Sequence, residues 1–207
     1  MRKITLAFCL LVVAAVAAHY RFDPWGFYWK VSQEEAARRL SLVTTAETWL
    51  GTNESDESHQ RILDIYNTHE PLAQGYVVQP SDSWCAAFVS AAAIQSDLTQ
   101  IVPTECSCER QIGLFQELGR WVEDDDIIPL PGDIIYYNWD QNESGENSGW
   151  SDHVGIVVGT KWPFLKVIEG NYDDMVKYRM IPLGDNRIRG YGKPDFSVAH
   201  TQNSAAP

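Results

Sequence analysis

The chain has 207 residues, of which 44% are hydrophobic and 21% are charged, and this balance is typical of a globular domain with a substantial core rather than of a disordered chain. Its formal net charge is −12. Such an acidic surface argues against a nucleic-acid partner, because binding phosphates requires patches of Lys and Arg.

Residues 1–18 have the pattern of an export signal. Arg2 and Lys3 precede an apolar stretch, Ile4 to Ala18, that is too short for a comfortable membrane span of ~20 residues. Ala15-Val16-Ala17 offers a cleavage site. The alternative is an uncleaved membrane anchor, because the aromatic residues of 19–31, which we interpret as a linker, suit a membrane interface. We therefore expect a secreted or cell-surface protein.

The cysteines indicate a free thiol. Cys9 lies in the predicted leader, so three of the four cysteines remain after its removal, and an odd number leaves at least one outside any intramolecular disulfide. Cys85 is our candidate. A bridge between Cys106 and Cys108 would close a strained ring, and no second Cys or His pair stands at zinc-finger spacing beside them. We expect these two to be reduced or loosely paired cysteines of a surface loop, and we expect no metal and no cofactor.

Helical patterns come first along the chain. SQEEAARRL predicts a helix capped by Ser32, with acidic residues in its first turn. ESHQRILDIYNTH places Ile62, Ile65 and Tyr66 on one helical face. Two further helices are predicted: Trp84 to about Gln95, capped by Ser83, and Ser107 to Val122.

Strand patterns follow Pro131. Residues with high β-propensity dominate GDIIYYNWD, HVGIVVG, FLKVIEGN, VKYRMIPL and IRGYGKPDF. Helices followed by an antiparallel meander predict an α+β fold, with N-terminal helices packed on an antiparallel β-sheet. We place one domain over residues 32–198 and expect residues 199–207 to form a disordered tail.

Three chemically complementary residues occur in order. Cys85 stands in SDSWCAAFVS, His153 in DHVGIVVG and Glu169 in VIEGN. They supply a nucleophile, a base and an orienting carboxylate. The first turn of the predicted helix would favour the Cys85 thiolate, and its backbone N–H groups could hold an oxyanion. Each residue alone has a common structural explanation, but the ordered set favours catalysis.

The hairpin around TKWPF predicts how two of these residues meet. If its strands pair about Lys161, Val157 faces Leu165 and His153 faces Glu169. Directly paired Cβ atoms lie about 4.5–5.5 Å apart on one face of a sheet, and a one-residue slip would separate them. Asn171 shares this parity.

WCAAFVS, PGDIIYY, DHVGIVVG and VIEGN together resemble the CHAP family, the cysteine- and histidine-dependent amidohydrolases/peptidases of the NlpC-type, papain-like superfamily. The resemblance covers roughly Ile62 to Phe196. It implies a papain-like fold in which Cys85 is the nucleophile, His153 the base, and Glu169 and Asn171 the polar partners. It also implies cleavage of an amide bond in peptidoglycan, at the muramoyl–alanine junction or within the peptides.

The sequence departs from some members of that family. Those members carry an acidic calcium loop before the nucleophile, whereas this chain has YVVQPSDSW, in which Asp82 alone supplies too few oxygen ligands. A separate wall-binding module is not visible. Two other functions therefore stay open: a catalytically silent wall-binding or adaptor domain, and an amidohydrolase for an amide outside the wall.

Three tryptophans are candidates for substrate contact. Trp84 precedes the nucleophile, while Trp139 and Trp150 flank the polar loop before His153. Their rings could stack on sugar or peptide, and the alternative is that they cap the sheet. We expect a monomer whose partner is peptidoglycan.

Overall fold

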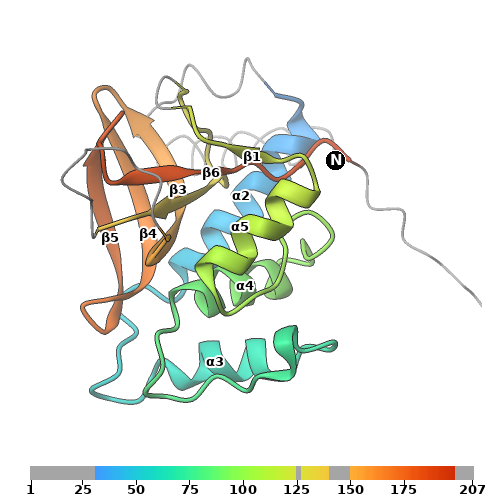
Figure 1. Ribbon diagram of the computed structural model, residues 1–207, viewed down its shortest axis with the longest axis vertical. Helices are drawn as coiled ribbons and strands as arrows, with labels where there is room; N and C mark the ends of the chain where they lie inside the picture. Colours follow the sequence, from blue (N-terminus) through green and yellow to red (C-terminus); the bar gives the residue numbers. More distant parts are fainter. Residues whose placement is uncertain (1–30, 125–126, 140–149, 199–207) are drawn as a thin grey trace, which may run out of the picture.

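The structure is a computed structural model that describes residues 31–124, 127–139 and 150–198 (Figure 1). The predicted export signal (1–18), nearly all of the predicted linker (19–31), the predicted tail (199–207) and most of the polar loop before His153 lie outside the described residues. Within the described ranges, no helix has the length and apolar composition needed to cross a membrane.

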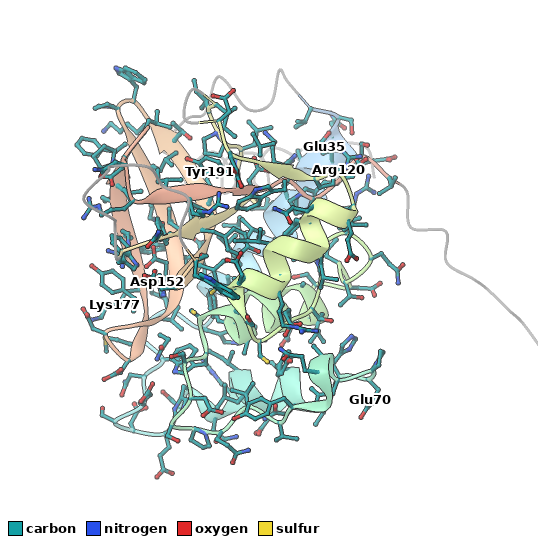
Figure 2. The ribbon with its side chains drawn as sticks, viewed as in Figure 1. Glu35, Glu70, Arg120, Asp152, Lys177 and Tyr191 are labelled. Atoms are coloured by element: carbon teal, nitrogen blue, oxygen red, sulfur yellow. The ribbon has the colours of Figure 1, made fainter. Side chains whose placement is uncertain are left out.

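Helix α2 (Gln33–Glu47) begins where the sequence predicts. The Ser32 hydroxyl accepts a hydrogen bond of 3.1 Å from the Glu35 backbone N–H, which satisfies one of the helix's unpaired donors. Arg39 is buried and joins α2 to the sheet: its guanidinium donates to Glu35 (2.9 Å; labelled in Figure 2) and to Asp133 (2.8 Å), the residue before β2 (Ile134–Tyr137).

Helix α3 (Gln60–Asn67) buries Ile62, Leu63 and Tyr66, and the short 3₁₀ turn η1 (Ala73–Gly75) follows it. The predicted apolar face is therefore shifted, because Leu63 is buried while Ile65 is only partly buried.

Helix α4 (Cys85–Gln95) lies in the middle of the molecule and packs against α2, α3 and two strands of the sheet. Every residue from Cys85 to Ala93 is buried, and five of them are alanines, whose small side chains let neighbouring elements approach closely. The N-cap residue is Trp84, with φ of −114°, so the prediction of a Ser83 cap is wrong.

Helix α5 (Cys108–Glu117) has Ser107 as its N-cap but ends five residues before the predicted Val122. Gly119 adopts a left-handed φ of 63°, and the Arg120 N–H donates to the Phe115 carbonyl at 2.8 Å, which closes the helix. The last residues of the predicted helix instead form the short strand β1 (Trp121–Val122), which pairs with β6 (Ile188–Gly192).

The remaining strands are β3 (His153–Lys161), β4 (Phe164–Tyr172) and β5 (Met175–Pro182). The described residues form a six-stranded sheet of order β1-β6-β2-β3-β4-β5, in which every neighbouring pair is antiparallel. The helices gather on one side of this sheet (Figure 1). The predicted α+β architecture, with helices on an antiparallel sheet, is confirmed.

Successive residues of a strand point to opposite faces, and the sheet accordingly separates two apolar clusters. Ile134 and Tyr136 of β2 join the helix-side core, which contains Cys85. Ile135 and Tyr137 join a second cluster, together with Val157, Leu165, Val167, Ile181, Ile188 and Tyr191. His153 pairs with Tyr137 in the β2–β3 ladder and so stands on the side of the second cluster.

Candidate active site

Cys85 is the first residue of α4 and its side chain is only 4% exposed. The Ala86 backbone N–H donates a hydrogen bond to its sulfur. Both this bond and the partial positive charge at a helix start favour a thiolate over a thiol. The predicted position of Cys85 at the beginning of a helix is confirmed.

His153 is the first residue of β3, and its Nε2 lies 3.0 Å from Oε2 of Glu169. The expectation that Glu169 and His153 meet is confirmed. The imidazole also stacks on the Tyr137 ring, with centroids 5.9 Å apart, which fixes its plane. Because Glu169 holds Nε2, Nδ1 is the ring nitrogen that remains to face the Cys85 sulfur, whose influence helps to raise the pKa of His153.

The strand register differs from the predicted one. Lys161 pairs with Phe164 and Thr160 with Leu165, whereas Val157 pairs with Val167, so Val158 is an extra residue on β3. The predicted direct pairs Val157–Leu165 and His153–Glu169 are wrong.

The bulge at Val158 decides the face on which the carboxylate lies. If the pairing near the turn continued unbroken, Glu169 would face Ile156, whose side chain is in the helix-side core. The single extra residue changes the parity of every pair beyond it. Glu169 therefore shares a face with His153 after all, as its diagonal rather than its direct neighbour.

Arg179 on β5 is a site residue that the sequence analysis missed. Its Nε donates to both Glu169 oxygens, at 2.7 and 2.9 Å, and its guanidinium lies over the rings of Tyr172 (3.9 Å) and Trp139 (4.6 Å). Because Lys177 pairs with Glu169, Arg179 stands two residues along on the same face. The sequence signal for Arg179 was the spacing of Lys177 and Arg179 in VKYRMIPL, which places both cations on one face of the strand.

Burial raises the pKa of Glu169, but the hydrogen bonds and charges of His153 and Arg179 outweigh burial and leave that pKa below its ordinary value. Burial lowers the pKa of His153, yet the hydrogen bonds and negative charges of Cys85 and Glu169 raise it to about 10. The site thus holds an ionised carboxylate beside a protonated imidazole at neutral pH.

Cys108 is another site residue that the sequence did not reveal. It was expected in a surface loop, but it is buried, with its sulfur 3.6 Å from that of Cys85. Its thiol hydrogen bond is the largest cause lowering the pKa of Cys85; burial acts in the opposite direction, and the hydrogen bond and charge of His153 add to the lowering. Cys106 is only partly buried.

Asn171, expected as a polar partner in the catalytic set, and Trp84, expected as a substrate contact, both bond to Glu54. The Asn171 side-chain amide donates to the Glu54 carboxylate at 2.9 Å, and the Trp84 indole N–H donates to the same oxygen at 2.8 Å. Trp84 is fully buried, so its predicted role as a substrate contact must be corrected: it holds the loop of Glu54 against the start of α4.

A cavity of about 430 Å³ opens beside the imidazole. It is lined by Trp139, Asp152 (labelled in Figure 2), His153, Asn171, Tyr172, Asp173 and Arg179. Trp139, one of the three tryptophans expected to contact substrate, thus lines a cavity next to His153. Trp150 is 79% exposed and is not part of this lining.

Within residues 31–124, 127–139 and 150–198, no group of three or more His, Cys, Asp or Glu side chains is placed to hold a metal ion. Asp82, the acidic residue before the nucleophile, accepts hydrogen bonds from the Tyr76 hydroxyl (2.7 Å) and the Gln79 backbone N–H (2.8 Å).

No protein-family model and no curated protein matches this sequence. Among solved structures, "The crystal structure of Ly7917" is similar at 12% identity and a TM-score of 0.44, over 76% of this chain and 62% of that one. "The crystal structure of Ly7917 with the hydrolyzing product of MDP" has 15% identity and a TM-score of 0.38, over 54% of this chain and 53% of that one. This chain therefore spans less than two thirds of either neighbour. Similarities this weak establish neither a shared fold nor a shared activity.

Proposed function

We propose that this protein is a thiol-dependent hydrolase of peptidoglycan that cleaves an amide bond through Cys85, His153 and Glu169. The observation that carries the proposal is His153 hydrogen-bonded to a buried carboxylate that Arg179 holds, together with a cysteine at a helix start whose pKa His153 helps to lower. A nucleophile, a base and an orienting group in mutual contact are the parts that acyl transfer requires.

In the proposed reaction, the Cys85 thiolate attacks the carbonyl carbon of the scissile amide. The backbone N–H groups at the start of α4 stabilise the oxyanion that forms, because the first N–H groups of a helix have no partner within the helix. The His153 imidazolium gives its proton to the departing amine, and a thioester with Cys85 remains. His153, now neutral, takes a proton from water, which attacks the thioester and releases the carboxylic acid and the thiolate.

Glu169 and Arg179 serve this cycle through His153. Glu169 fixes the ring orientation and stabilises the imidazolium, and Arg179 keeps Glu169 ionised in a buried position. A buried carboxylate with a single partner would favour protonation, which would weaken its hold on His153.

The cavity beside His153 supports a peptide of mixed charge as the substrate. It offers the carboxylates of Asp152 and Asp173, the guanidinium of Arg179 and the aromatic rings of Trp139 and Tyr172. Stem peptides of peptidoglycan carry amino and carboxyl groups beside their amide bonds, so both charges of the lining have counterparts. We further propose, from the sequence motifs, that the domain is a CHAP-type, papain-like domain exported to the cell surface or beyond.

Purified protein incubated with peptidoglycan tests this function. We expect new amino groups and shortened muropeptides by mass spectrometry, and neither product from the Cys85→Ala variant. Full activity in Cys85→Ala would end the thiol mechanism. If the protein binds peptidoglycan but releases no products, it is a silent wall-binding domain. If it leaves peptidoglycan intact but cleaves small peptide amides, its substrate lies outside the wall.

A further inference from the structure

Cys85 and Cys108 form a pair of buried thiols inside the proposed site. Their sulfur atoms lie 3.6 Å apart, and the residues are 4% and 8% exposed. Cys106, two residues before Cys108, points elsewhere: its sulfur accepts a contact of 3.7 Å from the Gln74 side chain. Only Cys108 of these two thiols is therefore placed to react with the nucleophile.

Buried hydrogen bonds fix Cys108 in this position. The Ser90 hydroxyl of α4 donates to the Glu105 carbonyl (2.7 Å) and accepts from the Glu105 N–H (2.8 Å), which ties the segment before α5 to α4. Gln111, one turn after Cys108, donates to the Pro103 carbonyl at 2.7 Å and accepts from the Tyr136 hydroxyl at 2.9 Å. The approach of the two sulfurs is thus built into the packing of α5 on α4.

The two thiols differ in protonation. The hydrogen bond from Cys108, opposed by burial and assisted by His153, lowers the pKa of Cys85 well below its ordinary value. The hydrogen bond to Cys85, followed by burial and by the negative charge of Cys85, raises the pKa of Cys108. One sulfur is therefore a reactive thiolate and its neighbour a thiol, which is the usual arrangement of an oxidisable cysteine and its resolving partner.

We propose that Cys108 is a resolving cysteine, and that hydrogen peroxide or a related peroxide converts Cys85 and Cys108 into a reversible disulfide that silences the site. The Cys85 sulfur attacks one peroxide oxygen, the O–O bond breaks, and after proton transfer Cys85 carries a sulfenic acid and one water has left. The Cys108 sulfur then attacks the Cys85 sulfur, the S–O bond breaks, and the departing hydroxide takes the Cys108 proton as a second water. Two thiols lose two electrons and the peroxide gains them.

This modification is compatible with the geometry. A disulfide has an S–S length near 2.05 Å, so sulfurs 3.6 Å apart need to approach by only about 1.5 Å to form the bond. The regulatory consequence rests on the proposed function, because a disulfide silences the enzyme only if the Cys85 thiolate is its nucleophile. The disulfide would also protect Cys85 from irreversible oxidation to sulfinic acid.

The cross-link can be read without any substrate. The reduced full-length protein is treated with hydrogen peroxide, the peroxide is removed with catalase, and remaining thiols are blocked with iodoacetamide. Glutamyl endopeptidase cleaves after Glu105 and so separates the Cys85 peptide from the peptide 106–109, which contains Cys106 and Cys108. We expect these two peptides to be joined, with a mass lower by two hydrogens than their sum, and Cys85 alkylation to fall about tenfold or more and to recover with dithiothreitol.

Two conservative variants assign the partner. Cys106→Ser is the matched control and should still form the cross-link. Cys108→Ser should not form it, and its Cys85 should proceed to sulfinic acid that dithiothreitol does not restore. Circular dichroism melting of each variant shows whether it folds.

The proposal would be overturned by a cross-link that persists in Cys108→Ser. It would also be overturned if Cys85 of the wild-type protein stayed reduced, or reached sulfinic acid, without forming a cross-link. The two proposals fail separately. A cross-link in wild type together with full activity of Cys85→Ala removes the thiol mechanism but leaves the thiol pair. An inactive Cys85→Ala with no cross-link in wild type removes only the redox role.

Discussion

Glu169 reaches His153 by passing beside Gly155. A Cβ atom at position 155 would lie 2.7 Å from Cγ of Glu169 and 2.6 Å from Cγ1 of Val167, well inside van der Waals contact. Gly155 thus leaves room for the Glu169 side chain to cross the strand face diagonally, so that its Oε2 lies 3.0 Å from Nε2 of His153.

Gly155→Ala should therefore displace Glu169. We expect a loss of about 1–3 kcal/mol in the free energy of unfolding, the usual cost of overpacking, and a fall in activity because the imidazole loses its orienting partner. Urea denaturation and peptidoglycan cleavage measure the two effects. Gly113→Ala on α5 is the control, since a Cβ there has open space around it and should stabilise the helix by up to about 1 kcal/mol. Equal stability of Gly155→Ala and wild type would contradict the close approach.

Iodoacetamide should alkylate Cys85 before Cys106 and Cys108 near neutral pH, although Cys106 is the more exposed. The reason is that the pKa of Cys85 is lowered, which favours the reactive thiolate, whereas the pKa of Cys106 is raised, mainly by burial. Removing the imidazole in His153→Ala should slow alkylation of Cys85 and abolish hydrolysis. Peptide mapping after timed alkylation gives the order, and a first modification at Cys106 would argue against a thiolate at position 85.

Glu169→Gln should keep the fold and lower kcat by roughly 10²–10⁴-fold, as loss of the orienting carboxylate does in a Ser-His-Asp site. The amide can still bond Nε2 but cannot stabilise the imidazolium. Initial rates on isolated peptidoglycan, with thermal melting to verify folding, check this. An unchanged rate in a folded variant would remove Glu169 from the mechanism.

Activity should rise with pH through the lowered pKa of Cys85, stay level across neutral pH, and fall near pH 10. The fall follows from the pKa of His153, raised to about 10, because above it the imidazolium that donates the proton to the leaving amine is lost. A pH profile of kcat/KM on a soluble stem peptide tests this. An alkaline limb near the ordinary imidazole pKa of about 6.5 would show that the ion pair does not form.

Arg179→Ala leaves the buried Glu169 with His153 alone. We expect a loss of about 2–4 kcal/mol in stability, because the Glu169 carboxylate stays buried without its guanidinium partner. The pKa of Glu169 should rise, so that protonation of Glu169 rather than of Cys85 limits activity at acid pH and moves the acid limb to higher pH. Lys177→Ala on the same strand is the control, because its half-exposed pair with Asp173 should contribute less than about 1 kcal/mol. Urea denaturation at neutral pH compares them, and similar losses would contradict a special role for Arg179.

The sequence by itself determined the local features of this protein. Ser32 caps α2, Cys85 begins α4, and the order of helices and strands follows from periodicity and capping, which act over a few neighbouring residues. It also indicated that His153 and Glu169 belong together. That contact formed although the predicted register did not, because an even shift of two residues preserves the face on which a strand residue lies.

Only the tertiary structure decided what depends on packing between distant segments. No local pattern encodes the register shift at Val158 between β3 and β4. The same holds for two contacts between separate elements, the salt bridge of Arg179 with Glu169 and the approach of Cys108 to Cys85. Trp84 illustrates the same limit: its place beside the nucleophile suggested a substrate contact, but α4 is buried at its first turn and takes Trp84 into the core. Adjacency along the chain places Trp84 beside Cys85, whereas the packing of the folded chain directs the Trp84 side chain to Glu54.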